Sequence, residues 1–324
     1  MDKYYSEKDL YNSGKIELAV KSLEQKGLIY SGTLSPPKGK TVEDYEPREQ
    51  LLFKSTDYGD DVDRPIKKSD GGWTYFAPDI AYHFDKIERG FDELIDVFGA
   101  DHSGYVKRMK AAVSALSDGR VTLDVKLCQL VRLFKDGLPY KMSKRAGNFV
   151  ALSDIIEEVG KDVVRFLMLT RKNDAPLDFD FDKALEQSKD NAVFYVQYAH
   201  ARCSSILSKA VGMKVDIQTI NISALDLAVL TSQSELKIIL KLVEWPRIVE
   251  LSALSHEPHR IVFYLYELAG EIHSFQHEGK LNVNLRVLSE DRDQMVARLV
   301  LITVARMVIR SGLEILGVSP LTNM

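Results

Sequence analysis

The spacing of apolar residues changes along this chain and predicts a mixed first part followed by helices. Residues 93–99 form a short apolar run typical of a buried strand, and residues 121–134 alternate between apolar and polar side chains, as strands do. Helical spacing occurs between these two segments, at residues 105–116, and also at residues 10–28. From Ser153 onward, helical spacing continues nearly to the end of the chain. The pattern therefore predicts an α/β part and then an all-α part.

A break in the helical pattern is expected to end the α/β part. The break covers residues 176–181, with the sequence Pro-Leu-Asp-Phe-Asp-Phe. We place a domain boundary just after it, near residue 186, which gives domains 1–186 and 187–324. A length of 324 residues is enough for about two domains with a core in each.

The second domain is expected to consist of long helices. Pro246 and Pro258 stand where helices are expected to begin, a position at which proline is tolerated, and Gly317 is expected to end the last helix. The expected helices cover residues 182–209, 226–243, 246–255, 258–277 and 291–316.

Composition adds a charge asymmetry to this picture. The chain is 45% apolar and 28% charged, as in ordinary globular proteins, and its net charge is −4. The positive charge is concentrated in residues 101–150, which hold ten Lys and Arg against four Asp and Glu. An acidic protein with such a cationic segment is able to bind RNA locally. No apolar run is long enough for a membrane span, so we expect a soluble, cytoplasmic protein that does not contact a membrane.

The metal-ligating residue types are not arranged as a metal site. Cys128 and Cys203 are far apart, which leaves neither a disulfide framework nor a paired-cysteine zinc site. His256 and His259 resemble a metal pair, but the proline between them at an expected helix start spoils the geometry. We therefore expect no protein-bound metal.

A strongly cationic loop is the most distinctive stretch. It reads Lys141, Met142, Ser143, Lys144 and Arg145, and lies between an extended segment with an Asp-Gly hairpin turn and a helical pattern. Cations in a flexible loop suit a polyphosphate, although a short string of this kind is more often a solvated surface loop.

Three further residues each have an ordinary structural interpretation when taken alone. Asp79 stands where a helix running to about Arg89 is expected to begin, so by position alone it reads as a helix N-cap. Tyr75 reads as a core aromatic residue. His102 follows the strand at residues 93–99, at the end of a strand where open α/β sheets bind ligands, and a structural hydrogen bond is an equally good interpretation.

Four ordered motifs together resemble the arginyl-tRNA synthetases, a family of class I aminoacyl-tRNA synthetases. The motifs are Gly72–His83, Gly99–Tyr105, the Lys-Met-Ser-Lys-Arg loop and Tyr195–Arg202, and the similarity runs along nearly the whole chain. It implies the C-terminal half of a class I Rossmann-like catalytic domain, followed by a helical-bundle anticodon-binding domain.

The resemblance also implies an activity and a set of roles. It implies an arginine-tRNA ligase that attaches arginine to tRNA(Arg) through arginyl-adenylate, with ATP as substrate and Mg²⁺ assisting. The cationic loop, residues 141–145, would bind ATP, with Lys141 and Lys144 as catalytic residues. Arginine would be held by Tyr75, Asp79 and His102, which agrees with the need of a guanidinium for a carboxylate. The tRNA would contact one helix face carrying Tyr195, Gln197, Tyr198, His200 and Arg202.

Two departures from the family pattern limit this reading. The His-x-Gly-His-type ATP signature of class I synthetases is absent from the sequence, and Ala192 stands where the family commonly has proline. We therefore expect a fragment, or one half of a split synthetase whose N-terminal half is a separate partner. The alternative is a non-catalytic tRNA-binding fragment. A synthetase for another amino acid fits less well, because an apolar substrate would leave Asp79 unpaired.

Overall fold

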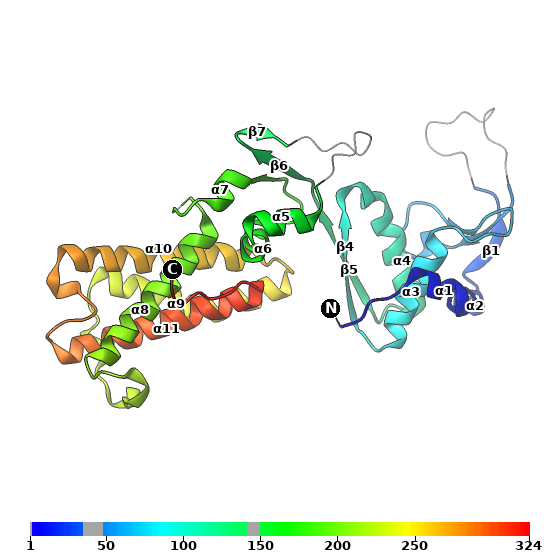
Figure 1. Ribbon diagram of the computed structural model, residues 1–324. Coiled ribbons are helices and arrows are strands. Elements are labelled where there is room, and N and C mark those ends of the chain that lie inside the picture. Colours follow the sequence, from blue (N-terminus) through cyan, green and yellow to red (C-terminus); the bar gives the residue numbers. More distant parts are fainter. Residues whose placement is uncertain (1, 35–47, 141–149, 189) are drawn as a thin grey trace. The chain divides into compact units, whose positions relative to one another are not determined.

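The computed structural model in Figure 1 describes residues 2–34, 48–140, 150–188 and 190–324. By its internal contacts the chain divides into two compact units, residues 1–130 and 131–324. The boundary expected near residue 186 is a different division, between the α/β part and the long helices, and it stays a prediction.

The first unit begins with two short helices and a small antiparallel sheet of order β1-β2-β3. A single helix was expected over residues 10–28, but Gly14, at φ 69°, separates two helices because it adopts a left-handed conformation that favours glycine. The elements are α1 (Glu7–Asn12), α2 (Lys15–Gln25), β1 (Ile29–Gly32), β2 (Gln50–Phe53) and β3 (Arg64–Lys67).

The centre of this unit is a parallel strand pair with its connecting helix. Strand β4 (Glu93–Gly99) and helix α4 (Val106–Ser117) confirm the predicted strand and helix, and β5 (Thr122–Cys128) pairs with β4 in parallel. Helix α4 packs against α2, α3 (Phe76–Glu88) and β5, and the core lies among these elements. The β4 strand was expected to be buried, yet its side chains alternate between buried and exposed positions, so one face of this strand packs on the core and the other is largely exposed.

The second unit starts with a small mixed sheet of order β7-β6-β8. The predicted Asp136-Gly137 hairpin is confirmed, since both residues have positive φ and join the antiparallel strands β6 and β7. The segment expected to be a plain break contains strand β8, which pairs with β6 in parallel. The elements are β6 (Val131–Lys135), β7 (Leu138–Pro139), α5 (Leu152–Val159), α6 (Lys161–Met168), β8 (Leu177–Asp180) and α7 (Phe181–Leu185).

The all-α part is confirmed as a bundle of long helices, with limits that differ from those predicted (Figure 1). The helix expected over 182–209 is interrupted after α7, and the one expected over 226–243 begins only at Gln233. Pro246 lies inside a continuous helix rather than at a helix start, so the prediction of two helices there was wrong. The bundle helices are α8 (Ala192–Gly212), α9 (Gln233–Leu254), α10 (His259–Leu281) and α11 (Arg292–Leu316).

A fully buried ion pair lies inside this bundle. Arg298 of α11 donates from Nε to Oε1 of Glu235 at 2.6 Å, and both side chains are 1% exposed. Nη1 of Arg298 also donates to the carbonyl oxygens of Asn284 and Arg286, at 2.7 and 2.9 Å. Burial acts to raise the pKa of Glu235, but the bonds from Arg298 and Ser232 outweigh it and hold that pKa below its usual value. The pair thus ties α9 and α11 to the segment that follows α10.

Helix α11 ends at a glycine that is packed against α6. Gly317 has φ 70°, and Arg165 of α6 donates from Nε to the carbonyl of Leu316 at 2.9 Å. A Cβ atom at Gly317 would lie 2.7 Å from that Nε atom. Since the amide of Ser319 also donates to Asp162 of α6, at 3.0 Å, the chain end is held on α6 by two contacts.

Replacing Gly317 with alanine is expected to destabilise the second unit by about 1–2 kcal/mol, because it forces a left-handed backbone on alanine and displaces the Arg165 guanidinium. The matched control is Gly212→Ala at the end of α8, where a Cβ would meet nothing within 4 Å. That change is expected to be neutral or to stabilise by roughly 0.5 kcal/mol. Urea unfolding measures both, and equal effects of the two substitutions would contradict the expectation.

Within the described part of the chain, no helix is both long and apolar enough to cross a lipid bilayer.

Candidate functional site

Asp79 lies on helix α3 of the first unit, and its carboxylate accepts a hydrogen bond from a tyrosine. Helix α3 begins at Phe76, three residues earlier than expected, so Asp79 lies in its first turn. The interpretation of Asp79 as an N-cap is therefore wrong: the N-cap position belongs to Tyr75, which makes no side-chain cap bond. Tyr105, at the start of α4, donates its hydroxyl proton to Oδ2 of Asp79.

Among the residues that the structure describes, the Asp79 carboxylate has no ion-pair partner. Burial raises the pKa of Asp79 above its usual value, the Tyr105 hydrogen bond and the charge of His83 oppose this, and the charges of Glu7 and Asp96 act in the same direction as burial. No Lys or Arg of the residues described here forms an ion pair with it. Such a carboxylate gains more from a bound cation than an exposed one does, because its charge is poorly solvated.

A histidine and a second aspartate form hydrogen bonds that hold helix α3 next to strand β4. His83, one turn after Asp79, makes a hydrogen bond of 2.8 Å between Nδ1 and the Asp79 carbonyl oxygen. On the other side of the His83 ring, Nε2 lies 2.8 Å from Oδ2 of Asp96 on β4. The Oδ1 atom of Asp96 accepts a hydrogen bond from Lys86 at 2.9 Å. Burial acts to raise the pKa of Asp96, but the bonds to His83 and Lys86 hold it below its usual value. The network joins helix α3 to strand β4.

Aromatic rings pack around Tyr105, and one of them also contacts His102. The Tyr105 ring packs edge-on against Phe76 and Phe98, with centroids 6.0 and 6.4 Å apart, and the Arg108 guanidinium lies 4.9 Å from its centre. Burial first, and then the Asp79 carboxylate, raise the pKa of Tyr105, so its hydroxyl stays protonated and donates. Phe98 also contacts His102, at 6.0 Å between ring centroids.

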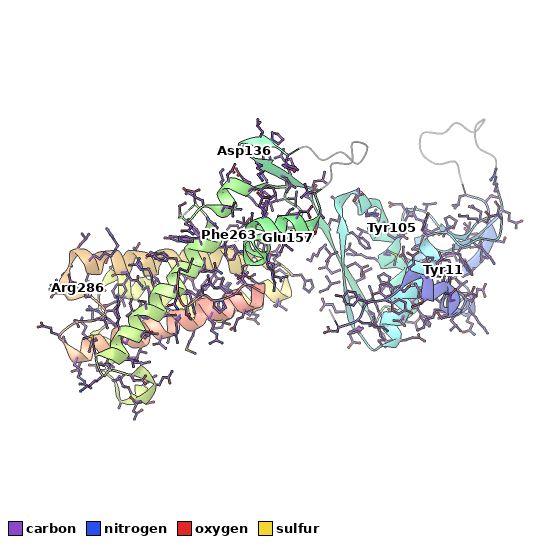
Figure 2. All side chains as sticks on the ribbon, viewed as in Figure 1. Tyr11, Tyr105, Asp136, Glu157, Phe263 and Arg286 are labelled. Atoms are coloured by element: carbon purple, nitrogen blue, oxygen red, sulfur yellow. The ribbon has the colours of Figure 1, made fainter. Side chains whose placement is uncertain are left out.

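The structure thus connects Asp79 and His102 through Tyr105 and Phe98, and leaves Tyr75 more isolated. The His102 side chain is 63% exposed and Tyr75 is 84% exposed, so the expectation of a core role for Tyr75 is wrong. Tyr75 lies one helical turn before Asp79, on the same side of α3. Both raise the pKa of Tyr11 of α1, after its partial burial and the charge of Glu7, so Tyr11 lies within reach of their charges. Figure 2 labels Tyr11 on α1 and Tyr105 at the start of α4.

Sequence reasoning missed four residues of this site: Tyr105, His83, Asp96 and Tyr11. His83 had a usable signal, since it lies four residues after Asp79 and therefore on the same helix face. Tyr105 ends one of the family motifs but had no role assigned. Asp96 and Tyr11 come together with Asp79 only through tertiary packing, which the sequence pattern does not encode.

The cationic loop lies outside the described residues. The candidate ATP-binding residues Lys141, Met142, Ser143, Lys144 and Arg145 all belong to it, and their roles stay predictions.

The five candidate tRNA-binding residues all lie on α8, but not on one face as expected. Gln197 and His200 are buried, and they bond the carbonyl oxygens of Ser319 and Leu321 at 2.9 and 2.7 Å. The other three residues face α10 and one another. Tyr195 lies 4.5 Å from the His273 ring, Tyr198 stacks on His273 at 5.6 Å, and the Arg202 guanidinium lies 5.3 Å from the centre of the Tyr198 ring. Contact of any of the five with tRNA stays a prediction.

Comparison with protein families identifies both parts of the chain. Residues 40–205 match the family model described as tRNA synthetases class I (R), catalytic domain, and residues 196–324 match the DALR anticodon binding domain. The chain belongs to the arginyl-tRNA synthetase family. The predicted fold class, a partial class I catalytic domain followed by a helical anticodon-binding domain, is confirmed.

Individual arginyl-tRNA synthetases match along the entire chain. The arginine–tRNA ligases of Ruegeria pomeroyi and Paracoccus denitrificans are both 63% identical to it, over 100% of the chain and 56% of their own length. The chain therefore spans about half the length of these curated relatives.

Solved structures of arginyl-tRNA synthetases are similar in fold to this chain. The one from Campylobacter jejuni has a TM-score of 0.77 at 31% identity, covering 100% of this chain and 65% of that one. The Thermus thermophilus arginyl-tRNA synthetase has a TM-score of 0.75 at 20% identity, covering 98% of this chain and 59% of that one, and shows the shared fold.

The described residues offer no preformed metal site. No group of three or more His, Cys, Asp or Glu side chains among them is arranged to hold a metal ion.

Proposed function

We propose that this chain takes part in the ATP-dependent attachment of arginine to tRNA(Arg) and that its first unit holds the arginine. The observation that carries the proposal is the Asp79 carboxylate, which is half-buried, hydrogen-bonded to Tyr105 and in no ion pair with a described Lys or Arg. A guanidinium supplies the missing charge, and its planar donors suit a carboxylate.

The surrounding residues have supporting roles in this proposal. Tyr105 occupies one carboxylate oxygen, which leaves Oδ1 of Asp79 for the arginine side chain. Tyr75 and His102 are exposed and have polar groups available for the rest of the substrate. An apolar amino acid would cover the half-buried carboxylate without supplying a positive charge, which costs binding free energy. The site therefore favours a cationic substrate.

ATP and tRNA are assigned to the second unit on sequence grounds. The cationic loop at residues 141–145 would stabilise the triphosphate as pyrophosphate leaves, with Lys141 and Lys144 as catalytic residues. Mg²⁺ would arrive with ATP, bound to its phosphates, since such ions are usually held by substrate phosphates and few protein groups. The match to the DALR domain supports tRNA binding by the bundle. The cytoplasmic location stays a prediction.

Arginine affinity is expected to fall as the pH is lowered through the raised pKa of Asp79. Arginine binds the ionised carboxylate, so protonation competes with it, and affinity drops about tenfold for each pH unit below that pKa. Calorimetric titration with arginine at several pH values from about 5 to 8 measures how the affinity depends on pH. In Tyr105→Phe the carboxylate loses its hydrogen bond, so the midpoint is expected to move to higher pH. A pH-independent affinity, or an unchanged midpoint in that variant, would contradict the assignment.

Arginine- and tRNA-dependent exchange between ATP and pyrophosphate tests whether this chain catalyses the reaction by itself. Exchange above background means that the chain forms an ATP site without the His-x-Gly-His-type signature, which its sequence lacks. Absence of exchange together with specific tRNA(Arg) binding favours the alternative, a non-catalytic tRNA-binding fragment or one half of a split synthetase. Adding a separate N-terminal half then distinguishes these two, because only the split enzyme regains exchange.

A further inference from the structure

Helix α9 is apolar on two opposite sides, of which one is covered by the bundle and the other is exposed. The covered side packs on α10 and α11, with Ile238 fully buried and Leu242 and Trp245 partly buried in the core. Because a surface helix usually has polar residues opposite its buried side, the exposed side of α9 needs a separate explanation. This side, which we call the outer face of α9, carries five large apolar residues: Leu236, Leu240, Val243, Leu251 and Leu254.

The apolar residues of the outer face are spaced for contact with another helix. Four of the five, all except Leu251, belong to the series of positions 236, 240, 243, 247, 250 and 254, whose steps alternate between four and three residues. This is the spacing of the seam between two helices that pack side by side. The side chains of Leu240, Val243 and Leu254 extend into solvent in a single copy of the chain, since these residues are 66%, 73% and 74% exposed.

The area of the outer face matches that of a small specific interface. Its five apolar residues leave roughly 500 Å² accessible, so two such faces together present roughly 1,000 Å², the lower limit of specific protein–protein interfaces. Pro246 is exposed on the same helix and adds to this area, as do the aliphatic stems of the neighbouring charged residues. Apolar patches of this size on soluble proteins often have a binding function.

Charged residues beside the outer face indicate which partner fits it. Glu244 and Arg247 are both exposed near the middle of the helix, three residues apart. When a second α9 lies antiparallel on the first and the two helices cross near Trp245, Glu244 of each copy comes opposite Arg247 of the other. Two reciprocal ion pairs then form around a two-fold axis. Glu244 uses Oε2 to pair with Lys241 of its own helix, at 3.1 Å, and Oε1 remains for the second copy.

The same register also pairs the apolar residues of the two outer faces. Leu236 of one copy comes opposite Leu254 of the other, because the midpoint of these two positions is residue 245. Leu240 comes opposite Leu251 for the same reason. One antiparallel arrangement therefore satisfies the charged and the apolar residues together. In a parallel pair of α9 helices, Glu244 would lie level with Glu244 of the other copy, and like charges would meet.

We propose that two copies of this chain associate through the outer faces of α9, which lie antiparallel around a two-fold axis. Each outer face is occupied by the other copy, so the contact closes and the assembly stops at two chains. Because the interface is at the lower limit of area, the dimer is expected to form at micromolar concentrations of the chain. The association goes beyond the proposed function and does not depend on the substrate that the chain binds.

Sedimentation velocity of the full chain measures the mass of the particle, and a rise from one chain to two is expected between about 1 and 100 µM. Leu240→Glu is expected to weaken this association at least about tenfold, because it places a charge against Leu251 of the other copy. The matched control is Met307→Glu, which makes a similar change at an exposed apolar residue of α11. It is expected to associate as the original chain does.

Variants at the two charged residues test the antiparallel register. Glu244→Lys and Arg247→Glu each place like charges opposite one another in a dimer of identical chains, and each is expected to weaken association about tenfold. An equal mixture of these two variants is expected to associate as the original chain does, because every position 244 then faces a position 247 of opposite charge. Glu250→Lys makes the same change of charge on the same helix, outside the proposed pair, and is expected to have little effect.

Urea unfolding separates a lost contact from a lost fold. Leu240, Glu244 and Arg247 are exposed, so each variant is expected to unfold at the same urea concentration as the original chain when the protein is too dilute to dimerise. At high protein concentration the original chain is expected to unfold at a higher urea concentration, because association stabilises the folded state. Leu240→Glu is expected to show no such dependence on concentration.

Four results would overturn the dimer. A mass of one chain at every concentration would leave the outer face to a different protein, and particles larger than two chains would contradict a closed two-fold contact. Equal association of Leu240→Glu and the original chain would place the interface elsewhere. The antiparallel pairing is wrong if the mixture of Glu244→Lys and Arg247→Glu stays as weak as each variant alone, or if Glu250→Lys weakens association as much as Glu244→Lys. None of these results bears on arginine binding, so the proposed function is tested separately.

Discussion

Arginine binding is expected to weaken by about 2–5 kcal/mol when Asp79 is replaced by asparagine, because the substitution removes the carboxylate charge that would pair with the guanidinium in the proposed site. Asparagine has nearly the same size and is still able to accept the hydrogen bond from Tyr105, so α3 and α4 keep their packing. The loss therefore reports on charge and not on folding. Calorimetric titration of the full chain with arginine measures the change, and filter binding shows whether tRNA affinity is kept.

The matched control for this prediction is Asp57→Asn, an exposed aspartate of the same unit. It is expected to bind arginine as tightly as the original chain. Equal arginine affinity in the Asp79 and Asp57 variants would remove Asp79 from the site. Loss of tRNA binding together with arginine binding in Asp79→Asn would indicate a structural role instead.

Replacing Arg298 with methionine is expected to lower the free energy of unfolding of the second unit by about 3–5 kcal/mol, because it leaves Glu235 as an unpaired buried charge. Two backbone carbonyls, those of Asn284 and Arg286, lose their donor as well. Urea unfolding followed by tryptophan fluorescence measures the effect. The chain has two tryptophans, so a Trp73→Phe background leaves Trp245, which packs against Tyr264 inside the bundle, as the reporter.

Arg310→Met is the matched control, since Arg310 pairs with Glu314 at 2.8 Å on the same helix, with both side chains more than half exposed. Exposed pairs of this kind contribute between about 0 and 1 kcal/mol. A double variant, Glu235→Leu with Arg298→Met, is expected to recover most of the lost stability, because no charge is then left buried. Similar losses in the Arg298 and Arg310 variants would show that burial does not set the strength of this pair.

The elements that sequence predicted well are those whose limits are set locally. The Asp136-Gly137 hairpin follows from residues that accept positive φ, and the strand and helix over residues 93–116 follow from one unbroken apolar pattern. Predictions based on proline and on short polar breaks were less reliable. Pro246 is tolerated inside α9 because that helix packs along α10, so tertiary contacts outweigh the missing N–H bond. Strand β8 was hidden in a four-residue segment whose pairing with β6 is not local.

The candidate site shows the same division between local and tertiary information. Motif similarity and the chemistry of a guanidinium both predict Asp79 as an arginine ligand, and this stays a prediction. The start of α3 was misplaced by three residues, which gave Asp79 a capping role that it does not have. The Tyr105 bond and the His83 contact to Asp96 join segments brought together only by folding. On α8, helical geometry alone would have separated Gln197 and His200 from the other three candidates, because the two groups lie on opposite sides of the helix.

The contacts around Asp79 also bear on how arginine would be told apart from lysine. The main chain at Asp79 is tied to β4 through His83, and its side chain is tied to α4 through Tyr105. A carboxylate fixed on both sides has little rotamer entropy left to lose when a ligand binds, so less of the binding energy is spent on ordering it. A carboxylate held in this way also cannot move to reach a shorter or differently shaped cation. Discrimination between a planar guanidinium and a compact ammonium group would therefore be set by the rigidity of the folded protein before the amino acid arrives.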